Sequence, residues 1–222
     1  MINYKIAEIF TSINGEGTRA GQLAVFIRFC GCNLHCSYCD TWWANESDAL
    51  FRYSTTQDIV SLVGELGIKN VTLTGGEPLI QEGIEELIDA LGRMEGIRVE
   101  IETNGAVPLK PFAGMDRRPH FTMDYKLPGS KMEEFMCLEN FDVLTMDDAV
   151  KFVIKDQADM FVVRDIIEKY DLTKKCRVLI SPVFGEIEPE ELVLFIKGNL
   201  LNDVTLQIQL HKIIWDENMR GV

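Results

Sequence analysis

Three cysteines in one short segment are the residues of this sequence best suited to chemistry. Cys32, Cys36 and Cys39 stand in the run C-N-L-H-C-S-Y-C, a C-x3-C-x2-C spacing with Tyr38 before the last cysteine. Iron–sulfur clusters use thiolate ligands, and a tight loop can bring three of them to one [4Fe-4S] cluster. Because three ligands leave one iron open, the spacing predicts a cluster that can bind and activate a small molecule.

The same cysteines also allow a structural zinc site or a disulfide. Zinc sites usually take four ligands, and Cys30 or His35 could complete the set, but this spacing is not a common zinc pattern. A disulfide requires an oxidising compartment. The segment Met1–Lys5 enters a strand-like run without a signal peptide, and no apolar run approaches the ~20 residues that span a bilayer. We therefore expect a reduced, cytoplasmic protein.

The length and charge of the chain limit the classes of function. A chain of 222 residues suits one domain with a sizeable core, which we place over residues 1–222. It has 35 acidic and 22 basic residues, a formal net charge of −13. This acidity argues against binding nucleic acid or an anionic membrane surface. We expect a small-molecule substrate.

Short apolar runs with strand-like composition alternate with segments of helical periodicity. The expected strands are Ala24–Phe29, Asn70–Thr74, Arg98–Glu102, Val150–Ile154, Arg177–Ser181 and Val204–Gln209. The expected helices are one that starts at a capping box in Ser54–Gln57 and stops at Gly67, then Ile84–Met94, Ala158–Tyr170 and Pro189–Gly198, with 108–119 as a loop. This alternation predicts βαβ units and a parallel sheet.

Polar turns follow several of these strands. They are Thr74-Gly75-Gly76-Glu77-Pro78, Glu102-Thr103-Asn104-Gly105, Asp124-Tyr125-Lys126 and Ser181-Pro182-Val183-Phe184. In parallel α/β folds the carboxyl ends of the strands meet at one mouth, so these turns should converge with the cysteine loop. Gly75 and Gly76 would let the backbone approach a ligand closely, and Glu77 would suit an ammonium group. Each turn alone is also an ordinary βα turn.

The cysteine spacing followed by Gly-Gly-Glu-Pro resembles the radical S-adenosylmethionine superfamily. Within it the chain is similar to the 7-carboxy-7-deazaguanine synthases, from about residue 4 to the end. The residues that carry this resemblance are Ile13–Gly17, Arg28, Gly31–Leu34, Cys39–Thr41, Gln209–Lys212 and Met219–Val222. It implies an α/β fold, a partial, modified TIM-type barrel of βα repeats, as a homodimer.

The resemblance also implies an activity. Cys32, Cys36 and Cys39 would hold a [4Fe-4S] cluster whose fourth iron is chelated by S-adenosylmethionine. An electron from a flavodoxin-like donor would generate a 5′-deoxyadenosyl radical, which takes hydrogen from C6 of 6-carboxy-5,6,7,8-tetrahydropterin. Ring contraction and loss of ammonia, a carbon–nitrogen lyase reaction of queuosine and deazapurine biosynthesis, would then give 7-carboxy-7-deazaguanine and regenerate S-adenosylmethionine.

The resemblance assigns further residues to this site. The implied cofactor contacts are Tyr38, Gly76, Glu77, Asn104, Asp124, Tyr125, Lys126 and Ser181, and Thr41 would bind Mg²⁺ beside the substrate carboxylate. The implied substrate contacts are Ile13, Asn14, Gly15, Glu16, Arg28, Thr74, His211 and the terminal carboxylate of Val222. The family more often has glutamine where this chain has Asn14, so the contacts expected from Ile13 to Gly15 are those of the backbone.

Several of these residues have simpler interpretations. Arg28 shares a strand face with Cys30, and its guanidinium could bind a substrate carboxylate or form an internal salt bridge with a glutamate. Glu16 could accept two pterin N–H groups or lie in a surface loop. Thr41 could simply end a turn, and His211 could be a core residue. Cys30, Cys137 and Cys176 suit buried, inert thiols.

Two other classes of protein fit parts of the pattern. A glycyl-radical activating enzyme uses the same cluster on a short chain, but it needs an open face to admit a polypeptide. An iron–sulfur electron carrier or a zinc-stabilised binding module would need a fourth ligand at the metal. Neither gives a reason for Glu16, Arg28 and Thr41 together.

Overall fold

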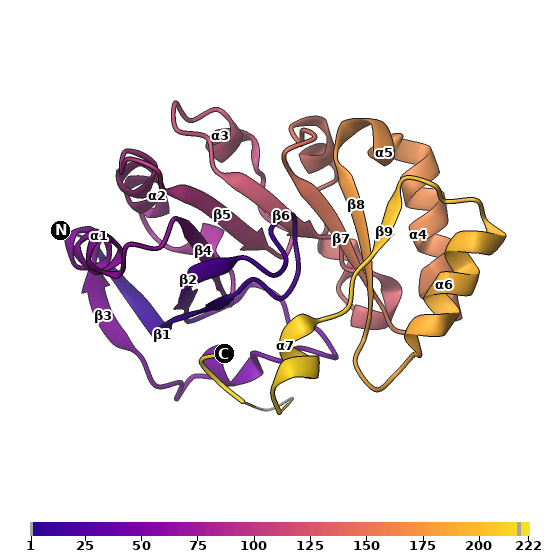
Figure 1. The fold of residues 1–222 in the computed structure, drawn as a ribbon, viewed down its shortest axis with the longest axis horizontal. Helices are drawn as coiled ribbons and strands as arrows, with labels where there is room; N and C mark the ends of the chain where they lie inside the picture. The colour runs from indigo at the N-terminus through magenta and orange to yellow at the C-terminus, as the bar shows by residue number, and fades with distance from the viewer. Residues whose placement is uncertain (1, 217–218) are drawn as a thin grey trace.

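The computed structural model describes residues 2–216 and 219–222, and one curved sheet runs through them (Figure 1). Its nine described strands follow the order β3-β1-β2-β4-β5-β6-β7-β8-β9. Their bounds are β1 Asn3–Ile13, β2 Leu23–Phe29, β3 Arg52–Thr55, β4 Asn70–Gly75, β5 Arg98–Thr103, β6 His120–Asp124, β7 Ala149–Ile154, β8 Arg177–Pro182 and β9 Val204–Leu206. From β2 to β9 all neighbours are parallel, whereas β1 pairs antiparallel with β2 and β3. The predicted partial barrel is confirmed.

Helices cover the outer face of this sheet (Figure 1). Their bounds are α1 Thr56–Leu66, α2 Ile84–Gly92, α3 Lys110–Ala113, α4 Gln157–Tyr170, α5 Leu172–Lys175, α6 Pro189–Gly198 and α7 Leu210–Ile214. In Figure 1, α1 to α3 lie over one half of the sheet and α4 to α6 over the other, while α7 lies away from both groups near the C-terminus. The inner face is therefore left to loops and to the end of the chain.

The two faces of the sheet differ in polarity because side chains alternate along each strand. On β5, Val99 and Ile101 belong to the buried core, and on β7 Phe152 does the same. The alternate positions of these strands face the barrel interior, and they include the charged residues Glu102 and Lys151, which line its cavity. The apolar face holds the helices, and the polar face is free to build a site.

The predicted start of α1 is wrong by one residue. Ser54 pairs with Tyr4 in the ladder between β3 and β1, so it belongs to a strand. Thr55 is the N-cap instead: its side chain accepts from the backbone N–H of Asp58, and the Asp58 carboxylate accepts from the N–H of Thr55 at 2.8 Å. The predicted stop is confirmed, since Gly67 has a left-handed φ of 65°.

Other boundaries also differ from the sequence prediction. The last strand ends at Leu206 rather than Gln209, because the following glutamine side chains turn towards the loop after β1. The second helix ends at Gly92 rather than Met94. The segment 108–119 contains the short helix α3. The edge strand β3 was not among the predicted strands, since it is only four residues long.

The loop between β1 and β2 spans the gap between the two sides of the open sheet. Gln207, just after β9, donates from Nε2 to the carbonyl of Gly17 at 2.9 Å and accepts from the N–H of Gly17 at 3.0 Å. The N–H of Leu210 adds a bond to the carbonyl of Gly15 at 3.3 Å. These bonds fix residues 15–17, and with them Glu16, against the far side of the barrel.

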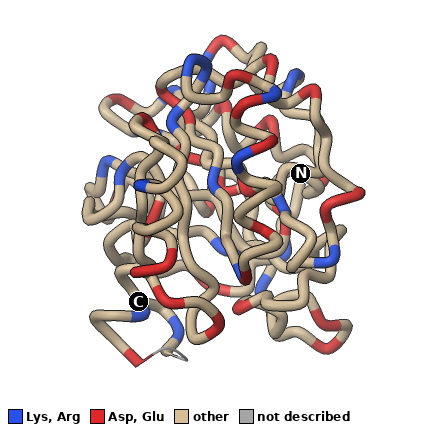
Figure 2. Tube along the Cα trace, turned by 90° about the vertical axis from the view of Figure 1, so that its right-hand side faces the viewer, with Lys and Arg blue, Asp and Glu red and all other residues tan. Residues whose placement is uncertain are grey.

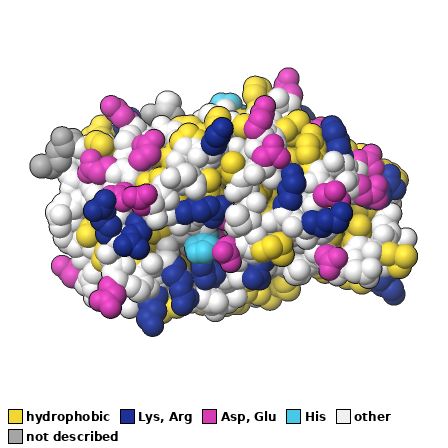
Figure 3. Space-filling model, turned by 90° about the horizontal axis from the view of Figure 1, so that it is seen from above, with side chains coloured by type: hydrophobic (Ala, Val, Ile, Leu, Met, Phe, Trp, Pro, Cys, Tyr) yellow, Lys and Arg dark blue, Asp and Glu magenta, His cyan; other side chains and the backbone are white. Residues whose placement is uncertain are grey.

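The surface mixes charges of both signs. Lys and Arg alternate with Asp and Glu along the trace in Figure 2 and over the face shown in Figure 3, where apolar side chains are scattered among them. Within residues 2–216 and 219–222, no helix has the length and apolar character needed to cross a membrane.

Candidate active site

A cavity of about 680 Å³ opens at the carboxyl ends of the parallel strands. Its walls come from the strand ends, the cysteine loop, the loop after β1, α7 and the last residues of the chain. Most of the sequence-predicted site residues line it: Ile13, Gly15, Glu16, Arg28, Cys32, Cys36, Tyr38, Cys39, Thr41, Thr74, Gly76, Asn104, Asp124, Lys126, His211 and Val222. Residues far apart in the sequence therefore share one site.

The three cysteines of the loop are partly buried free thiols. The Sγ of Cys32 accepts from the Leu34 N–H at 3.4 Å and from Asn104 Nδ2 at 3.5 Å. Burial raises the pKa of the Cys32 and Cys36 thiols, so without a metal both favour the protonated form. In the described ranges no three His, Cys, Asp or Glu side chains converge on a site for a single metal ion.

The two glycines of the Gly-Gly-Glu-Pro turn line the cavity, and they also fit tightly against the cysteine loop. A Cβ on Gly76 would overlap the carbonyl of Gly31, and a Cβ on Gly75 would overlap the backbone of Phe29. The two glycines therefore let the turn pack against the start of the cysteine loop. The bond from the N–H of Glu77 to the carbonyl of Gly31, at 2.9 Å, fixes this contact.

Glu77 does not line the cavity, so the expected contact between its carboxylate and an ammonium group is not present. The side chain is fully buried and accepts from the N–H of Leu79 at 3.0 Å, from Thr103 Oγ1 at 2.9 Å and from the N–H of Asn104 at 2.7 Å. Burial raises its pKa to about 7, although the three hydrogen bonds act in the opposite direction. Glu77 therefore stabilises the segment at Thr103 and Asn104, which forms part of the cavity wall, without facing the cavity itself.

Glu16 is buried in the cavity and not in a surface loop. Its Oε1 accepts from Ser181 Oγ at 2.6 Å, and its Oε2 lies 3.1 Å from Lys151 Nζ and 3.2 Å from Gln209 Nε2. Burial alone would raise the pKa of Glu16, but the Lys151 charge and the hydrogen bonds outweigh it, and the pKa lies below its ordinary value. Glu16 is therefore a carboxylate, and Ser181 lies behind it, off the cavity wall.

Arg28 has the internal partner that its sequence position allowed. Its Nε lies 2.8 Å from Glu8 Oε1, and both side chains line the cavity with less than a quarter of their surface exposed. The guanidinium also lies 5.8 Å from the centre of the Phe10 ring. This pair places one cation and one anion on the β1–β2 wall.

The opposite wall holds a second group of charges. Asp124 lies 2.6 Å from Lys126 Nζ and 3.2 Å from Lys151 Nζ. Burial would raise the pKa of Asp124, but the two lysines hold it below its ordinary value. Burial would lower the pKa of each lysine, yet Asp124 beside both, with Glu16 beside Lys151, raises them. All of these groups are charged.

Tyr125 and Asn14 do not line the cavity, which corrects the contact expected from Tyr125; for Asn14 only a backbone contact was expected, and its side chain serves the fold. Tyr125 packs its ring 5.6 Å from that of Phe152 in the core, because it follows Asp124 and faces the opposite side. Asn14 is almost fully buried, and its Oδ1 accepts from Thr72 Oγ1 at 2.9 Å. Asn14 therefore anchors the loop after β1 to the barrel interior.

The end of the chain closes one side of the cavity. His211 on α7 lies against Gly15, where a Cβ would overlap its Nδ1, and burial lowers the pKa of the imidazole. Arg220 stacks over the Trp43 ring at 3.9 Å. Thr41 lines the cavity with its side chain 3.7 Å from the Cys39 Sγ, and its carbonyl accepts from the N–H of Ala44.

Some charged or polar wall residues were given no role in the site from the sequence. They are Glu8, Glu102, Lys151 and Gln209. Lys151 is the one charged residue in the run A-V-K-F-V-I, and Glu102 falls at an inward position of R-V-E-I-E-T. A charged side chain at an inward position of an apolar strand was the signal that could have found both.

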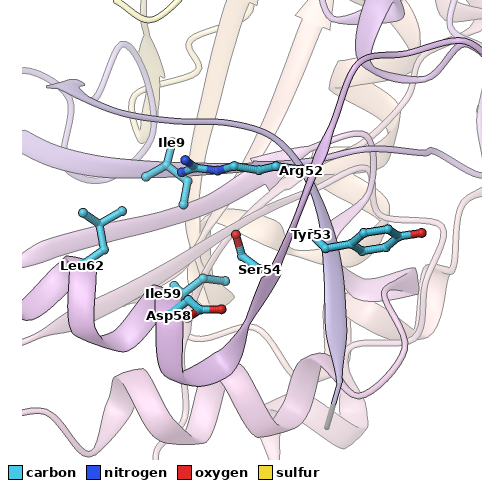
Figure 4. A pocket seen from close by; sticks show the side chains of 7 residues that line it. All are labelled: Ile9, Arg52, Tyr53, Ser54, Asp58, Ile59 and Leu62. Atoms are coloured by element: carbon cyan, nitrogen blue, oxygen red, sulfur yellow. The ribbon is translucent and has the colours of Figure 1, made fainter.

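A second hollow of about 260 Å³ lies on the surface between β1, β3 and α1 (Figure 4). It is lined by seven residues, among them Arg52 and Asp58, and it shares none of them with the main cavity. It contains no cysteine or histidine, so the chemistry belongs to the larger cavity.

Comparison with known proteins defines the class. The family model of the radical SAM superfamily matches residues 26–124, which include the cysteine loop and the Gly-Gly-Glu-Pro turn. The fold is similar to the crystal structure of QueE from Escherichia coli, with a TM-score of 0.71 and 21% identity over 93% of this chain and 94% of that one. Streptococcus suis SuiB has a TM-score of 0.57 and 14% identity over 81% of this chain. The fold is that of a radical S-adenosylmethionine enzyme, and the family model includes the cysteine loop.

Curated relatives define the family more closely. A 7-carboxy-7-deazaguanine synthase from Clostridium acetobutylicum is 57% identical over 221 residues, covering 100% of both chains. One from Chlorobaculum tepidum is 36% identical and covers 98% of this chain and 96% of its own. The chain therefore belongs to the 7-carboxy-7-deazaguanine synthase family.

Proposed function

We propose that the protein converts 6-carboxy-5,6,7,8-tetrahydropterin into 7-carboxy-7-deazaguanine with loss of ammonia, as a carbon–nitrogen lyase of queuosine and deazapurine biosynthesis. The observation that carries this proposal is the 57% identity to a 7-carboxy-7-deazaguanine synthase over the whole of both chains. The cavity supports it, because its opposed charged walls suit a small polar substrate that presents a carboxylate and several N–H groups.

The donor set of the cysteine loop fits a [4Fe-4S] cluster. Cys32, Cys36 and Cys39 are free and line the same cavity, and the amide of Asn104 lies beside one sulfur, where a hydrogen bond can tune a cluster. We assign the cluster to these thiols. When bound, the cluster and S-adenosylmethionine supply the one-electron chemistry that starts the reaction.

Eight residues are proposed to serve S-adenosylmethionine, in two ways. Tyr38, Gly76, Asn104, Asp124 and Lys126 line the cavity and would contact it directly. Glu77, Tyr125 and Ser181 lie behind the wall and position these contacts. The Asp124 carboxylate, kept ionised by two lysines, can accept hydrogen bonds from the cofactor.

Glu16 and Arg28 are proposed to fix the two ends of the pterin. The Glu16 carboxylate can accept from a ring N–H and the adjacent exocyclic amine, and the Arg28 guanidinium can bind the substrate carboxylate. His211, Thr74 and Val222 lie on the same cavity and would complete the contacts, with the backbone from Ile13 to Gly15. Because burial lowers the pKa of His211, its neutral imidazole both donates and accepts a hydrogen bond.

We also propose a Mg²⁺ at Thr41, whose hydroxyl is on the cavity wall. A hard cation with oxygen ligands, mostly water, suits one threonine and a substrate carboxylate. A flavodoxin-like electron donor, a homodimer, a cytoplasmic location and a single domain over residues 1–222 complete the proposal.

The enclosure of the cavity favours a small molecule over a protein substrate. Helix α7 and the last four residues line one of its sides, where a glycyl-radical activating enzyme would need room for a polypeptide. The charged groups at Glu16, Arg28 and Lys151 also suit a small heterocycle that presents a carboxylate and several N–H groups.

The test is an anaerobic assay of the cluster-reconstituted protein with dithionite, S-adenosylmethionine, Mg²⁺ and 6-carboxytetrahydropterin, followed by mass spectrometry. We expect 7-carboxy-7-deazaguanine over many turnovers without stoichiometric consumption of S-adenosylmethionine. Release of 5′-deoxyadenosine without this product would overturn the proposed substrate. The variant Cys36→Ala, which removes one proposed ligand, should show neither product nor the absorbance of a cluster.

A further inference from the structure

A continuous chain of contacts joins the two halves of the cavity. It runs from Gln209 and Ser181 to Glu16, then to Lys151, then to Asp124 and finally to Lys126. Its members come from the loop after β1, from β6, β7 and β8, and from the segments that follow β6 and β9. Glu16 belongs to the proposed substrate contacts, whereas Asp124 and Lys126 belong to those of the cofactor.

Lys151 is the point at which the two halves meet. Its Nζ lies 3.1 Å from Glu16 Oε2 and 3.2 Å from Asp124 Oδ1, and its side chain is 12% exposed. An ammonium has three N–H donors, so it can bond to both carboxylates at once. The neighbouring acids raise the pKa of Lys151 well above its ordinary value, so the bridge carries a positive charge throughout the physiological range.

We propose that Lys151 is a positioning residue that couples the binding of the pterin to the binding of S-adenosylmethionine. This inference rests on the proposed function, because it takes Glu16 as a substrate contact and Asp124 as a cofactor contact. Neither ligand has to touch the lysine for the coupling to operate.

The number of hydrogen bonds that the Glu16 carboxylate can accept explains how the coupling works. Its two oxygens offer about four acceptor sites, and three are in use, by Ser181, Lys151 and Gln209. A pterin that donates two N–H groups needs one more site than is free. Lys151 can release Glu16 without losing all its partners, because Asp124 is already within reach.

The attraction between Lys151 and Asp124 carries the effect to the cofactor site. When Lys151 moves towards Asp124, it holds that carboxylate more firmly in the position it needs to meet S-adenosylmethionine. The pterin should therefore increase the affinity for S-adenosylmethionine and, by thermodynamic linkage, the reverse should hold by the same factor. We expect a factor of at least about five, the lower end of typical allosteric coupling.

The experiment measures the dissociation constant of S-adenosylmethionine with and without saturating 6-carboxytetrahydropterin, anaerobically, without reductant, on cluster-reconstituted protein. Three variants are compared with the wild type. Lys151→Gln is uncharged and one bond shorter, Lys151→Arg keeps the charge and can span both carboxylates, and Lys175→Gln removes a surface lysine that pairs with Asp142.

The ratio compared is the dissociation constant of S-adenosylmethionine without the pterin divided by the constant with it. We predict a ratio of at least about five in the wild type and in Lys175→Gln, about one in Lys151→Gln, and an intermediate value in Lys151→Arg. A merely structural lysine would weaken both affinities and lower the melting temperature without changing the ratio. That result, or a wild-type ratio of one, would overturn the inference. If Lys151→Gln does not fold, Lys151→Met, which keeps the length of the side chain without its charge, takes its place, and an unchanged ratio in that variant would overturn the inference equally.

The experiment distinguishes a failure of the role proposed for Lys151 from a failure of the proposed function. A wild-type protein that neither binds 6-carboxytetrahydropterin nor forms 7-carboxy-7-deazaguanine would refute the function. A wild-type protein that does both, with a ratio unaffected in Lys151→Gln, would refute only the role of Lys151.

Discussion

The buried carboxylate of Glu77 offers the sharpest test of how the cavity wall is built. In Glu77→Gln the amide oxygen can replace Oε1 and keep the bonds from Leu79 and Thr103. The amide nitrogen then faces the N–H of Asn104, which donates to Oε2 at 2.7 Å in the wild type. Two donors cannot pair, so a buried N–H is left without a partner.

The size of the effect follows from that one lost bond. A buried N–H without a partner costs about 1–3 kcal/mol. For a chain of this length, 1 kcal/mol moves the melting temperature by about 2–4 °C, so we expect a decrease of about 2–12 °C. The measurement belongs near pH 4.5, where the wild-type Glu77, with a pKa raised to about 7, is protonated in the folded protein, because above pH 7 the cost of ionising this buried carboxyl would offset the lost bond.

The assay is thermal melting of the metal-free protein, followed by circular dichroism, so that cluster content does not enter. Glu82→Gln is the matched control, since Glu82 is an exposed residue of the same segment, and it should melt within about 1 °C of the wild type. Melting of Glu77→Gln within the same margin would refute the argument that this carboxylate holds the wall. Cluster uptake should also fall in Glu77→Gln, because Asn104 supports the Cys32 sulfur.

Three further perturbations test other parts of the structure. Arg28→Ala should abolish turnover of the pterin at unchanged iron content, because it removes the cation paired with Glu8, and loss of iron would show a structural role instead. Burial raises the pKa of Glu100 to about 7, so the wild type should lose up to roughly 3 kcal/mol of stability between pH 4.5 and pH 7 through this group. Denaturant unfolding at several pH values should show a flatter profile for Glu100→Gln, and an identical slope would contradict it. Gln207→Ala removes both bonds to Gly17, so amide hydrogen exchange in residues 15–17 should accelerate about tenfold or more, and unchanged protection would mean that other contacts hold the loop.

Much of the fold could be predicted from local patterns in the sequence. Strands β4, β5, β7 and β8 and helices α2 and α4 are marked by apolar runs and helical periodicity, and the structure has them within one or two residues of the expected bounds, whereas β6, α3 and α5 were given no bounds. The boundary at Thr55 was missed because Ser54 satisfies the same capping pattern but is taken up by pairing with Tyr4. Pairing between distant strands decides such cases, and a single sequence does not display it.

The sequence predicted which residues belong to the candidate site better than it predicted where their side chains point. The cysteines and the strand-end turns lie on one cavity as expected. The directions of Glu77 and Tyr125 were not predictable, because they depend on which neighbours satisfy a buried group: the backbone of Asn104 in one case and the aromatic core in the other. Lys151 was missed because its function comes from contacts with a loop 135 residues away.

The most direct measurement is an anaerobic crystal structure of the reconstituted protein with S-adenosylmethionine and 6-carboxytetrahydropterin. We predict a cluster on Cys32, Cys36 and Cys39, with the pterin between Glu16 and Arg28 in the same cavity. A pterin bound elsewhere, or a cluster held by a fourth protein ligand, would contradict it.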